Sequence, residues 1–404
     1  MFVDLIVIGG GAAGFFAAIT CAENSAKSVL ILEKTSHLLH KVKISGGGRC
    51  NVTHECFEPR EMSRNYPRGE KSLIGPLHKF GAADTVDWFA SRGVTLKTEA
   101  DGRMFPDTDS SQTIVDTLLG AADAAGVTVR TSEGVTSIVK NSEHFELTTD
   151  AGRSYTAGSV LIATGGTRLA AGARLAAALG HALAPPTPSL FTFKITDQRL
   201  EGLAGLSVNP ADIDIQQSKL SSSGPVLITH WGLSGPGILK ISAWGARELA
   251  ERNYRFDISV NWLPDADPAP VIAEMRLSEA KRRLSSRSPF PTISKRLWLR
   301  LLAAAGISDT ATWSQLTKSQ AHELHSQLTA SVFSVTGKST NKDEFVTCGG
   351  VVLDEINFKT MQSKLVNGLY FAGEVVDVDG VTGGFNFQNA WTSGFLAGSD
   401  VAAN

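Results

Sequence analysis

The chain has 404 residues, 42% of them hydrophobic and 19% charged, which excludes a disordered or fibrous protein and leaves room for two or three globular domains. A formal net charge of −2 gives the whole molecule no attraction to nucleic acid, although it is compatible with a local basic face. The four cysteines (Cys21, Cys50, Cys56 and Cys348) form neither a metal-ligand pattern nor a disulfide scaffold, and no apolar run reaches the ~18 residues that span a bilayer.

The first forty residues carry the clearest pattern. The apolar run 5–8 predicts a buried parallel strand, and a helical segment follows from Ala12. Between them lies the spacing Gly-x-Gly-x-x-Gly. Gly9 permits the tight turn, Gly11 leaves room for a pyrophosphate to approach the backbone, and Gly14 lets helix and strand pack closely. The free N–H groups at the helix N-terminus attract phosphate, so the pattern predicts dinucleotide binding.

A second apolar strand, 28–32, ends in Glu33, where an acidic side chain binds the hydroxyls of an unphosphorylated ribose. This arrangement favours FAD or NAD over NADP. An ordinary turn between strand and helix is the alternative. Because the apolar N-terminus has no basic leader and is interrupted by glycines, we interpret it as a strand rather than a signal peptide and expect a cytoplasmic protein.

A glycine-rich segment follows at 41–53. Its three consecutive glycines, 46–48, disfavour both helix and strand. They predict a loop that brings backbone amides and Arg49 close to a flat or anionic ligand, with a flexible surface turn as the alternative. The next residue, Cys50, is either a small packing residue or a redox group.

Helices and short strands alternate between 71 and 166. Helical spacing runs from Leu73 to Phe89 and over 111–125. Strands are predicted at 94–96, 127–130, 134–138, 145–148, 154–155 and 159–163. The last strand ends in Thr164-Gly165-Gly166, which fits a sheet that holds its ligand at the carboxyl ends of its strands; an ordinary strand exit is the alternative.

The prolines within 184–188 forbid helix and central strand and therefore mark a domain boundary. Beyond them, 189–262 shows short β-type pieces. A loop at 229–239 opens a helix, and its His230 either contacts substrate or satisfies the loop backbone.

A second shift in composition, at Leu263-Pro264, precedes a helical region at 269–330 with breaks at its prolines and at Gly306. One part of it carries eight basic residues against a single acid, Glu279: Arg276, Lys281, Arg282, Arg283, Arg287, Lys295, Arg296 and Arg300. This run is either a solvated helix face or an electrostatic contact for a phosphate backbone.

The C-terminal part returns to strands and glycine turns. A strand at 368–374 ends in Gly373-Glu374, and a glycine-rich turn from Gly380 leads into an apolar helix ending near Ala403. This order is typical of the second half of a flavin site, because the carboxylate binds ribityl hydroxyls and the helix N-terminus stabilises negative charge on a reduced flavin. An ordinary glycine turn before a helix is the alternative.

Together these motifs resemble the YhiN/BaiN/RdsA-type flavoproteins, also called the aminoacetone oxidase family, over essentially the whole chain. The most specific motifs are Lys43-Ile44-Ser45-Gly46-Gly47-Gly48-Arg49-Cys50-Asn51, Gly102 to Pro106, Thr229-His230-Trp231-Gly232-Leu233-Ser234-Gly235-Pro236, and Gly368 to Ala397. Cys348 stands where members commonly have alanine. The resemblance implies an α/β fold with three parts: a discontinuous Rossmann-type FAD-binding domain (1–188 and 342–404), an inserted β-barrel-like domain (189–262 and 331–341) and a small helical domain nested in that insert (263–330).

The resemblance also implies one FAD per chain. Its ADP half would lie at the first glycine turn, Glu33 and Lys34, its adenine at Val135, its pyrophosphate at Thr164-Gly165, and its ribityl and isoalloxazine at Gly373-Glu374 and 384–389. The full set of expected cofactor-binding residues is Gly9, Gly11, Ala12, Ala13, Gly14, Glu33, Lys34, Lys41, Ser45, Gly46, Gly47, Arg49, Cys50, Asn51, Val135, Thr164, Gly165, Gly166, Gly373, Glu374, Gly384, Phe385, Asn386, Gln388 and Asn389.

We therefore hypothesise an FAD-dependent oxidoreductase that passes hydride to an electron-poor C=C bond, with NADH or NADPH as transient reductant. Because members of the family differ in activity, the substrate is less constrained; a uridine of ribosomal RNA is preferred, since the basic helical insert would suit it. Arg49, Cys50 and His230 are the candidate catalytic residues, and no metal is expected. The alternatives are a flavin amine or small-acid oxidase and a non-catalytic flavin-binding sensor.

Overall fold

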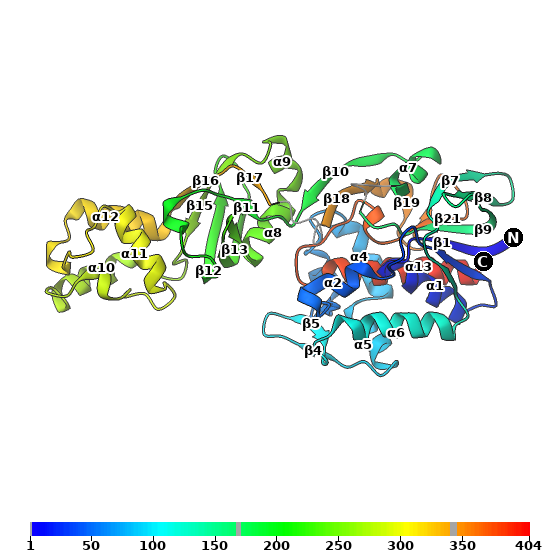
Figure 1. Ribbon diagram of the computed structural model, residues 1–404, viewed down its shortest axis with the longest axis horizontal. Coiled ribbons are helices and arrows are strands. Elements are labelled where there is room, and N and C mark those ends of the chain that lie inside the picture. Colours follow the sequence, from blue (N-terminus) through cyan, green and yellow to red (C-terminus); the bar gives the residue numbers. More distant parts are fainter. Residues whose placement is uncertain (1, 167–170, 340–345) are drawn as a thin grey trace. The chain divides into compact units, whose positions relative to one another are not determined.

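The computed structural model describes residues 2–166, 171–339 and 346–404 (Figure 1). The chain forms two compact units, and each is described by itself. Unit 1 comprises Met1–Ser189 and Lys342–Asn404, and unit 2 comprises Leu190–Asn341. The division into three domains stays a prediction, and its expected boundary at 341/342 lies outside the described residues.

The main sheet of unit 1 contains β1 (Phe2–Ile8), β2 (Val29–Leu32), β6 (Thr128–Arg130), β7 (Val135–Lys140), β8 (Phe145–Thr149), β9 (Ser154–Ile162), β19 (Ile356–Asn357), β20 (Gln362–Ser363) and β21 (Leu369–Phe371). Its order is β19-β20-β21-β9-β1-β2-β6, with β8 pairing to both β7 and β9. The strands expected at 154–155 and 159–163 are one continuous strand, β9.

Five consecutive strands of this sheet, β21, β9, β1, β2 and β6, run parallel. Ile8 of β1 lies in register with Leu32 of β2 and with Ile162 of β9. Ile162 is in turn in register with Phe371 of β21. The residues that follow these strands therefore line one edge of the sheet, where open α/β sheets bind their ligands.

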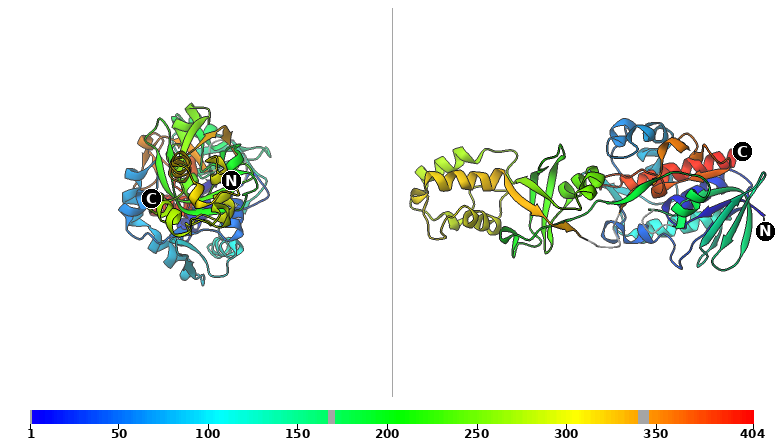
Figure 2. Two further views of the ribbon diagram at one scale, coloured as in Figure 1. Left: turned by 90° about the vertical axis from the view of Figure 1, so that its left-hand side faces the viewer. Right: turned by 90° about the horizontal axis from the view of Figure 1, so that it is seen from above.

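The helices of unit 1 are α1 (Ala12–Glu23), α2 (His40–Gly48), α3 (Pro59–Ser63), α4 (Glu70–Lys79), α5 (Ala82–Ala90), α6 (Ser111–Ala124), α7 (Ala171–Ala178) and α13 (Phe385–Ala403). The first and the last of them, α1 and α13, lie side by side (Figures 1 and 2). A Cβ at Gly394 would lie 2.7 Å from the carbonyl oxygen of Ala13, and a Cβ at Gly398 would lie 2.4 Å from that of Ala17. Such close approach of two helix backbones requires glycine.

Two smaller sheets complete unit 1. One has the order β3 (Thr53–His54), β5 (Arg103–Pro106), β4 (Leu96–Thr98), and in the other β10 (Leu183–Ser189) pairs antiparallel with β18 (Val346–Val351). We expected the prolines within 184–188 to exclude a helix and a central strand, and β10 belongs to a sheet of only two strands, so it is not a central one. A strand at this position was not predicted. The pairing register shifts between Ala184 and Thr187, so Pro185 and Pro186 fall in a bulge where no ladder N–H is needed.

Unit 2 is built on an antiparallel sheet with the order β16-β15-β12-β13-β14-β11-β17. Its strands are β11 (Phe193–Lys194), β12 (Ser207–Ile215), β13 (Ser221–Thr229), β14 (Gly232–Ser234), β15 (Phe256–Asn261), β16 (Ser331–Val335) and β17 (Gly337–Lys338). The helices α8 (Pro236–Trp244) and α9 (Ala246–Glu251) follow β14.

Three further helices, α10 (Pro268–Ser278), α11 (Lys295–Ala304) and α12 (Lys318–Thr329), are inserted between β15 and β16. They lie together beyond one end of the unit 2 sheet (Figure 2, yellow). Their shared core includes the buried Trp298 and Trp313, whose ring centroids lie 6.4 Å apart. Within the part of the chain that the structure describes, no helix is long and apolar enough to cross a membrane.

Candidate active site

The glycine turn after β1 has the shape of a phosphate cradle. A Cβ at Gly9, whose φ is +114°, would lie 2.5 Å from the carbonyl oxygen of Ala163, and a Cβ at Gly14 would lie 2.1 Å from that of Gly9, so the fold itself requires both glycines. Gly11 differs, because a Cβ there would meet no described atom within 4 Å and its φ of −96° suits any residue. This open space fronts the N-terminus of α1, which no side chain caps, and it fits a pyrophosphate.

Glu33 follows β2 beside this cradle. Its Oε2 accepts a hydrogen bond from the N–H of Gly10 at 2.8 Å, and its Oε1 accepts from the N–H and the hydroxyl of Thr35, both at 2.9 Å. The carboxylate is therefore oriented by the glycine turn. Because two carboxylate oxygens have about four acceptor sites, it retains capacity for a ribose hydroxyl.

Other expected cofactor residues lie along the same edge. Lys34 passes close to Gly134, where a Cβ would lie 3.0 Å from the Cβ of Lys34, and the buried Val135 then begins β7. Thr164 follows β9 next to the first turn, since a Cβ at Gly9 would lie 3.1 Å from its Cα.

The C-terminal half of the chain reaches this edge as well. A Cβ at Gly373, which follows β21 and has φ +73°, would lie 3.0 Å from the Cβ of Ala13. A Cβ at Gly166 would lie 2.9 Å from Oε1 of Glu374. The Oε2 of that glutamate pairs with Nζ of Lys41 at 2.6 Å. The structure thus brings together predicted residues from four separate segments.

The start of α13 is held by the segment around β3. The carboxamide of Asn51, oriented to satisfy both of its groups, accepts a hydrogen bond from the N–H of Gly384 at 3.0 Å and donates to the carbonyl of Thr53 at 2.9 Å. Gln388 is fully buried, and its Oε1 accepts from two threonine hydroxyls, that of Thr53 at 2.6 Å. We therefore assign Gln388 to supporting the helix rather than contacting a ligand. Asn389 is 4% exposed, and no partner of its carboxamide is seen among the described residues, which fits a ligand contact.

Phe385 and Asn386, also expected at the cofactor, shape the turn before α13. Asn386 accepts from the N–H of Gly380 at 2.8 Å and donates to its carbonyl at 2.9 Å. The carbonyl of Phe385 accepts from the hydroxyl of Tyr66 at 2.7 Å. Both residues thus fix the turn from which the first helical N–H groups project.

The glycine-rich segment forms the predicted loop. Helical dihedral angles in α2 end before Ser45, whose hydroxyl donates to the carbonyl of Val42 at 2.9 Å. The glycines at 46–48 have φ of +58°, +68° and +86° and are exposed. A Cβ at Gly46 would lie 3.2 Å from Phe105, while Gly47 faces open space. The loop therefore presents bare backbone, as expected for a surface that a flat ligand covers.

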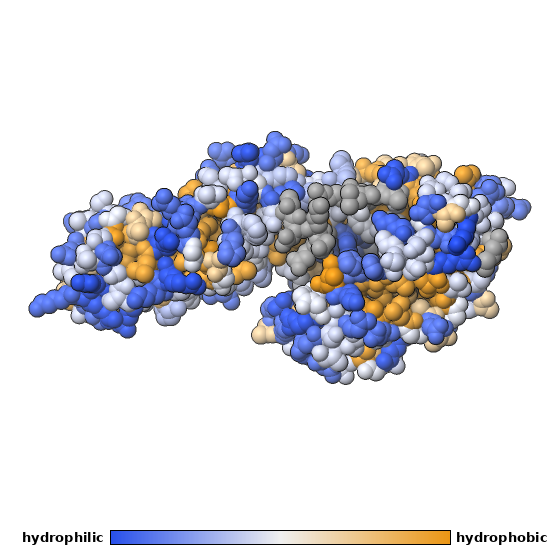
Figure 3. Space-filling model, in the orientation of Figure 1, coloured by the Kyte–Doolittle hydropathy of each residue, from blue (hydrophilic) through white to orange (hydrophobic). Residues whose placement is uncertain are grey.

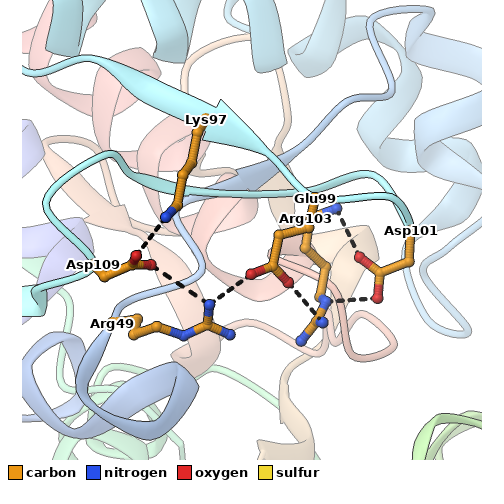
Figure 4. A network of polar contacts seen from close by, with 6 residues as sticks. All are labelled: Arg49, Lys97, Glu99, Asp101, Arg103 and Asp109. Carbon is orange, nitrogen blue, oxygen red and sulfur yellow. Dashed lines mark hydrogen bonds and ion pairs between the residues drawn. The ribbon is translucent and has the colours of Figure 1, made fainter.

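Arg49 belongs to an ionic network between this loop and the β4–β5 hairpin (Figure 4). Its Nη1 donates to Glu99 at 2.5 Å and lies 3.6 Å from Asp109, and its guanidinium lies 4.1 Å from the ring centroid of Phe105. The hydrogen bond to Glu99 is the main reason why the pKa of Arg49 is raised. Arg103 adds a second bond to Glu99 at 2.9 Å. Because its charge is compensated, we assign Arg49 to anchoring the loop, instead of the catalytic role expected from the sequence.

Cys50 does not suit the catalytic role considered for it. The residue is fully buried, so a substrate cannot reach its Sγ. Burial raises the pKa of the thiol from 9.0 to about 12, which keeps it protonated and unreactive at neutral pH. Of the two interpretations of this cysteine, the structure favours the packing residue.

His230 lies at the turn between β13 and β14 in unit 2, whereas the cofactor residues belong to unit 1. The expected loop is thus a tight hairpin, and α8 begins only at Pro236. His230 is exposed, and the neighbouring Trp231 is 59% exposed. The N–H of Ile195 donates to the carbonyl of Trp231 at 2.8 Å, which ties the turn to the residue that follows β11.

Sequence reasoning overlooked His54. Its Nδ1 lies 2.9 Å from the carbonyl oxygen of Gly383, and its ring stacks on Phe385 with centroids 4.8 Å apart. A signal was available, because His54 lies three residues after Asn51, directly beyond the segment assigned to the flavin. Its partner Gly383 is remote in sequence, so no local pattern could reveal the contact.

The basic residues predicted in the helical part of unit 2 differ in their partners and in their exposure. Arg300 donates to the carbonyl of Glu201 at 2.8 Å and Arg296 to that of Gly202 at 3.4 Å, so both help to hold α11 in place. Exposed side chains are those of Lys281, Arg283, Arg287, Lys295 and Arg296. The surface of α10 to α12 seen in Figure 3 is largely hydrophilic, in keeping with a solvated or polyanion-binding face. No group of three or more potential ligand side chains among the described residues could hold a metal ion.

Three comparisons place the chain among known proteins. The model of the HI0933-like protein Rossmann domain matches residues 3–400. A ribosomal RNA dihydrouridine synthase of Escherichia coli is 32% identical over 99% of this chain and 98% of its own length, and a 3-dehydro-bile acid delta(4,6)-reductase of Clostridium scindens is 28% identical over 98% of each. The crystal structure of a 3-ketosteroid-delta4-(5alpha)-dehydrogenase from Rhodococcus jostii, which is 15% identical, shares the fold with a TM-score of 0.53 over 99% of this chain and 97% of that one.

The Rossmann sheet and its cradle fit a dinucleotide, and the family model together with a relative named as a reductase identifies the chain as an FAD-dependent oxidoreductase. The family model matches nearly the whole chain, so it identifies the family within this class. The chain belongs to the HI0933-like family.

Proposed function

We propose that the chain reduces a C=C bond conjugated to a carbonyl group, with NADH or NADPH as the electron source, and that its substrate is a uridine of ribosomal RNA. The observation that carries the proposal is the 32% identity, over 99% of the chain, to a protein named ribosomal RNA dihydrouridine synthase. A second relative of that name, from Haemophilus influenzae, is 29% identical over 99% of both chains. Dihydrouridine differs from uridine by the saturated ring bond, so the name describes a C=C reduction.

The residues of unit 1 fit the parts of FAD. The N-terminus of α1 beside Gly11 would bind the pyrophosphate, Glu33 the adenosine ribose, and Glu374 the ribityl hydroxyls. The N-terminus of α13, from Phe385, would face the pyrimidine end of the ring and stabilise negative charge there. When bound, FAD supplies the hydride transfer between the nicotinamide and the substrate. The glycine loop at 46–48 would form a wall beside it.

Addition of hydride to one carbon of the double bond leaves negative charge on the conjugated carbonyl, and the other carbon takes up a proton. Of the two proton donors considered from the sequence, Cys50 is buried and does not suit the role, and His230 is exposed in unit 2, so the donor stays unassigned. The exposed basic side chains of unit 2 would contact the phosphates of an RNA substrate. Those contacts are independent of base identity, so they would position the RNA while the flavin site selects the base.

The test compares ribosomal RNA from a strain that lacks the gene with RNA from the same strain carrying the wild-type chain or a Gly11→Val variant. Mass spectrometry of nuclease digests reports dihydrouridine. The expected result is loss of one dihydrouridine on deletion, recovery with the wild-type chain and no recovery with Gly11→Val. Unchanged dihydrouridine in the deletion strain would exclude the RNA substrate.

The relative from Clostridium scindens favours a second candidate, reduction of a small conjugated acid. Anaerobic mixing of FAD-loaded protein with NADH or NADPH, followed by an RNA fragment or a steroid enone, separates the two, because only the true acceptor reoxidises the flavin. Hydrogen peroxide formation from an amine would favour the oxidase alternative. A flavin that neither pyridine nucleotide reduces would favour the sensor.

A further inference from the structure

We propose that His54 is a positioning residue that sets the reduction potential of the bound flavin by fixing the peptide turn at Gly383 and Gly384. The inference rests on the proposed placement of FAD at the start of α13. It assigns a function to a side chain that the motif pattern leaves without one.

His54 contacts this turn in two ways. A carbonyl oxygen only accepts hydrogen bonds, so the 2.9 Å contact between Nδ1 of His54 and the carbonyl of Gly383 places the proton on Nδ1. The imidazole also stacks on Phe385, the first residue of α13, with an interplanar angle of 28°. On its far side the ring is seated against Gly102, where a Cβ would lie 2.5 Å from Nε2. The ring is therefore held by the turn, the helix and the β4–β5 hairpin together.

Asn386 fixes the start of this turn at Gly380, and the two glycines before α13 depend on restraints from other segments. Gly383 has φ of +129° and Gly384 has φ of +95°, in regions where glycine moves freely. The neighbours of His54 restrain the second glycine: the N–H of Gly384 donates to Asn51, and a Cβ at Gly384 would lie 2.5 Å from the carbonyl oxygen of Thr53. His54 restrains the first, so β3 and the residues before it fix both peptides.

The direction of this turn determines where the first N–H groups of α13 point. No side chain caps the helix N-terminus, so these groups and the partial positive charge of the helix are available to a ligand. Their effect on a charge falls off within the first turn of the helix. A loosened Gly383 carbonyl would therefore reduce the stabilisation of negative charge on the reduced flavin and lower its potential.

The test uses two complementary variants with FAD bound. His54→Phe keeps a ring that stacks on Phe385 but removes the donor, whereas His54→Asn removes the ring but keeps an N–H donor for the carbonyl. His78→Ala, at an exposed histidine of α4, is the matched control. Two readouts are measured: the dissociation constant for sulfite, which adds to N5 and leaves negative charge on the pyrimidine ring, and the two-electron potential by anaerobic dye equilibration.

We expect His54→Phe to weaken sulfite binding about tenfold and to lower the potential by about 30 mV, the equivalent of a tenfold change for a two-electron couple. His54→Asn and His78→Ala should stay close to the wild type. A wild-type potential in FAD-loaded His54→Phe overturns the proposal. So does His54→Asn behaving like His54→Phe, because the effect would then not depend on the hydrogen-bond donor. If the wild-type chain itself fails to take up FAD, the proposed function fails instead.

Discussion

Alanine at Gly11 separates the ligand-binding role of the first glycine turn from its structural role. The added Cβ would meet no described atom within 4 Å, and the backbone has φ of −96°, so the apoprotein should fold as well as the wild type. Restricting the unfolded chain would even stabilise it by about 0.4–1 kcal/mol. The methyl group would occupy the space assigned to the pyrophosphate, and such overpacking costs about 1–3 kcal/mol. FAD should therefore bind roughly 5- to 150-fold more weakly.

Gly14→Ala is the matched control. Its Cβ would lie 2.1 Å from the carbonyl oxygen of Gly9, so the variant should lose stability on the order of 3 kcal/mol or more, whether or not FAD is present. Thermal unfolding of the apoprotein and fluorescence titration with FAD distinguish the two effects. The reasoning is refuted if Gly11→Ala binds FAD as tightly as the wild type, or if it unfolds at the temperature of Gly14→Ala.

Three further outcomes are expected. Burial raises the pKa of the Cys50 thiol from 9.0 to about 12, so in this pH range the folded chain keeps a proton that the unfolded chain releases. The stability of the wild type should therefore fall as pH rises from about 9 to 12. In melting curves Cys50→Ala should lack this component, and it should retain activity at pH 7. Trp231→Ala should raise KM for an RNA substrate, because it removes a stacking surface worth about 1–3 kcal/mol per base. Trp244→Ala, at another exposed tryptophan, should leave KM unchanged. Equal KM values for the two variants would argue against an RNA contact at the hairpin. Arg283→Glu should reduce the slope of log Kd for RNA against log salt by roughly 1, measured by fluorescence anisotropy, and Lys71→Glu on α4 should leave it unchanged.

The Rossmann core was predictable because its signals are local. The strand 5–8, the glycine spacing and Glu33 follow one another in the chain, and each position needs its residue type for a reason that a single sequence displays. The same holds for Gly373-Glu374, where a strand ends in a glycine and an acid. Here the residues expected to meet do meet, with Gly373 against Ala13.

Other features were not predictable because they depend on partners that lie far away in the chain. The sequence of Arg49 and its neighbours does not show that Glu99 accepts a hydrogen bond from its guanidinium. Likewise, the sequence around Gln388 does not show that its Oε1 accepts hydrogen bonds from two threonine hydroxyls. His54 was overlooked because Gly383 is remote from it. The strand β10 was not predicted, because the bulge that accommodates its prolines arises from its pairing with β18 and cannot be inferred from composition.

The backbone contact between α1 and α13 has a consequence for how the protein matures. Ala13 and Ala17 pack against Gly394 and Gly398, so the first helix finds its neighbour only after residues 385–403 have emerged from the ribosome. Until then the side of α1 that packs against α13 is exposed to water in the nascent chain. The helix that completes the expected FAD site has also not yet formed. We therefore expect FAD to bind late, after unit 2 has been synthesised and not during its synthesis.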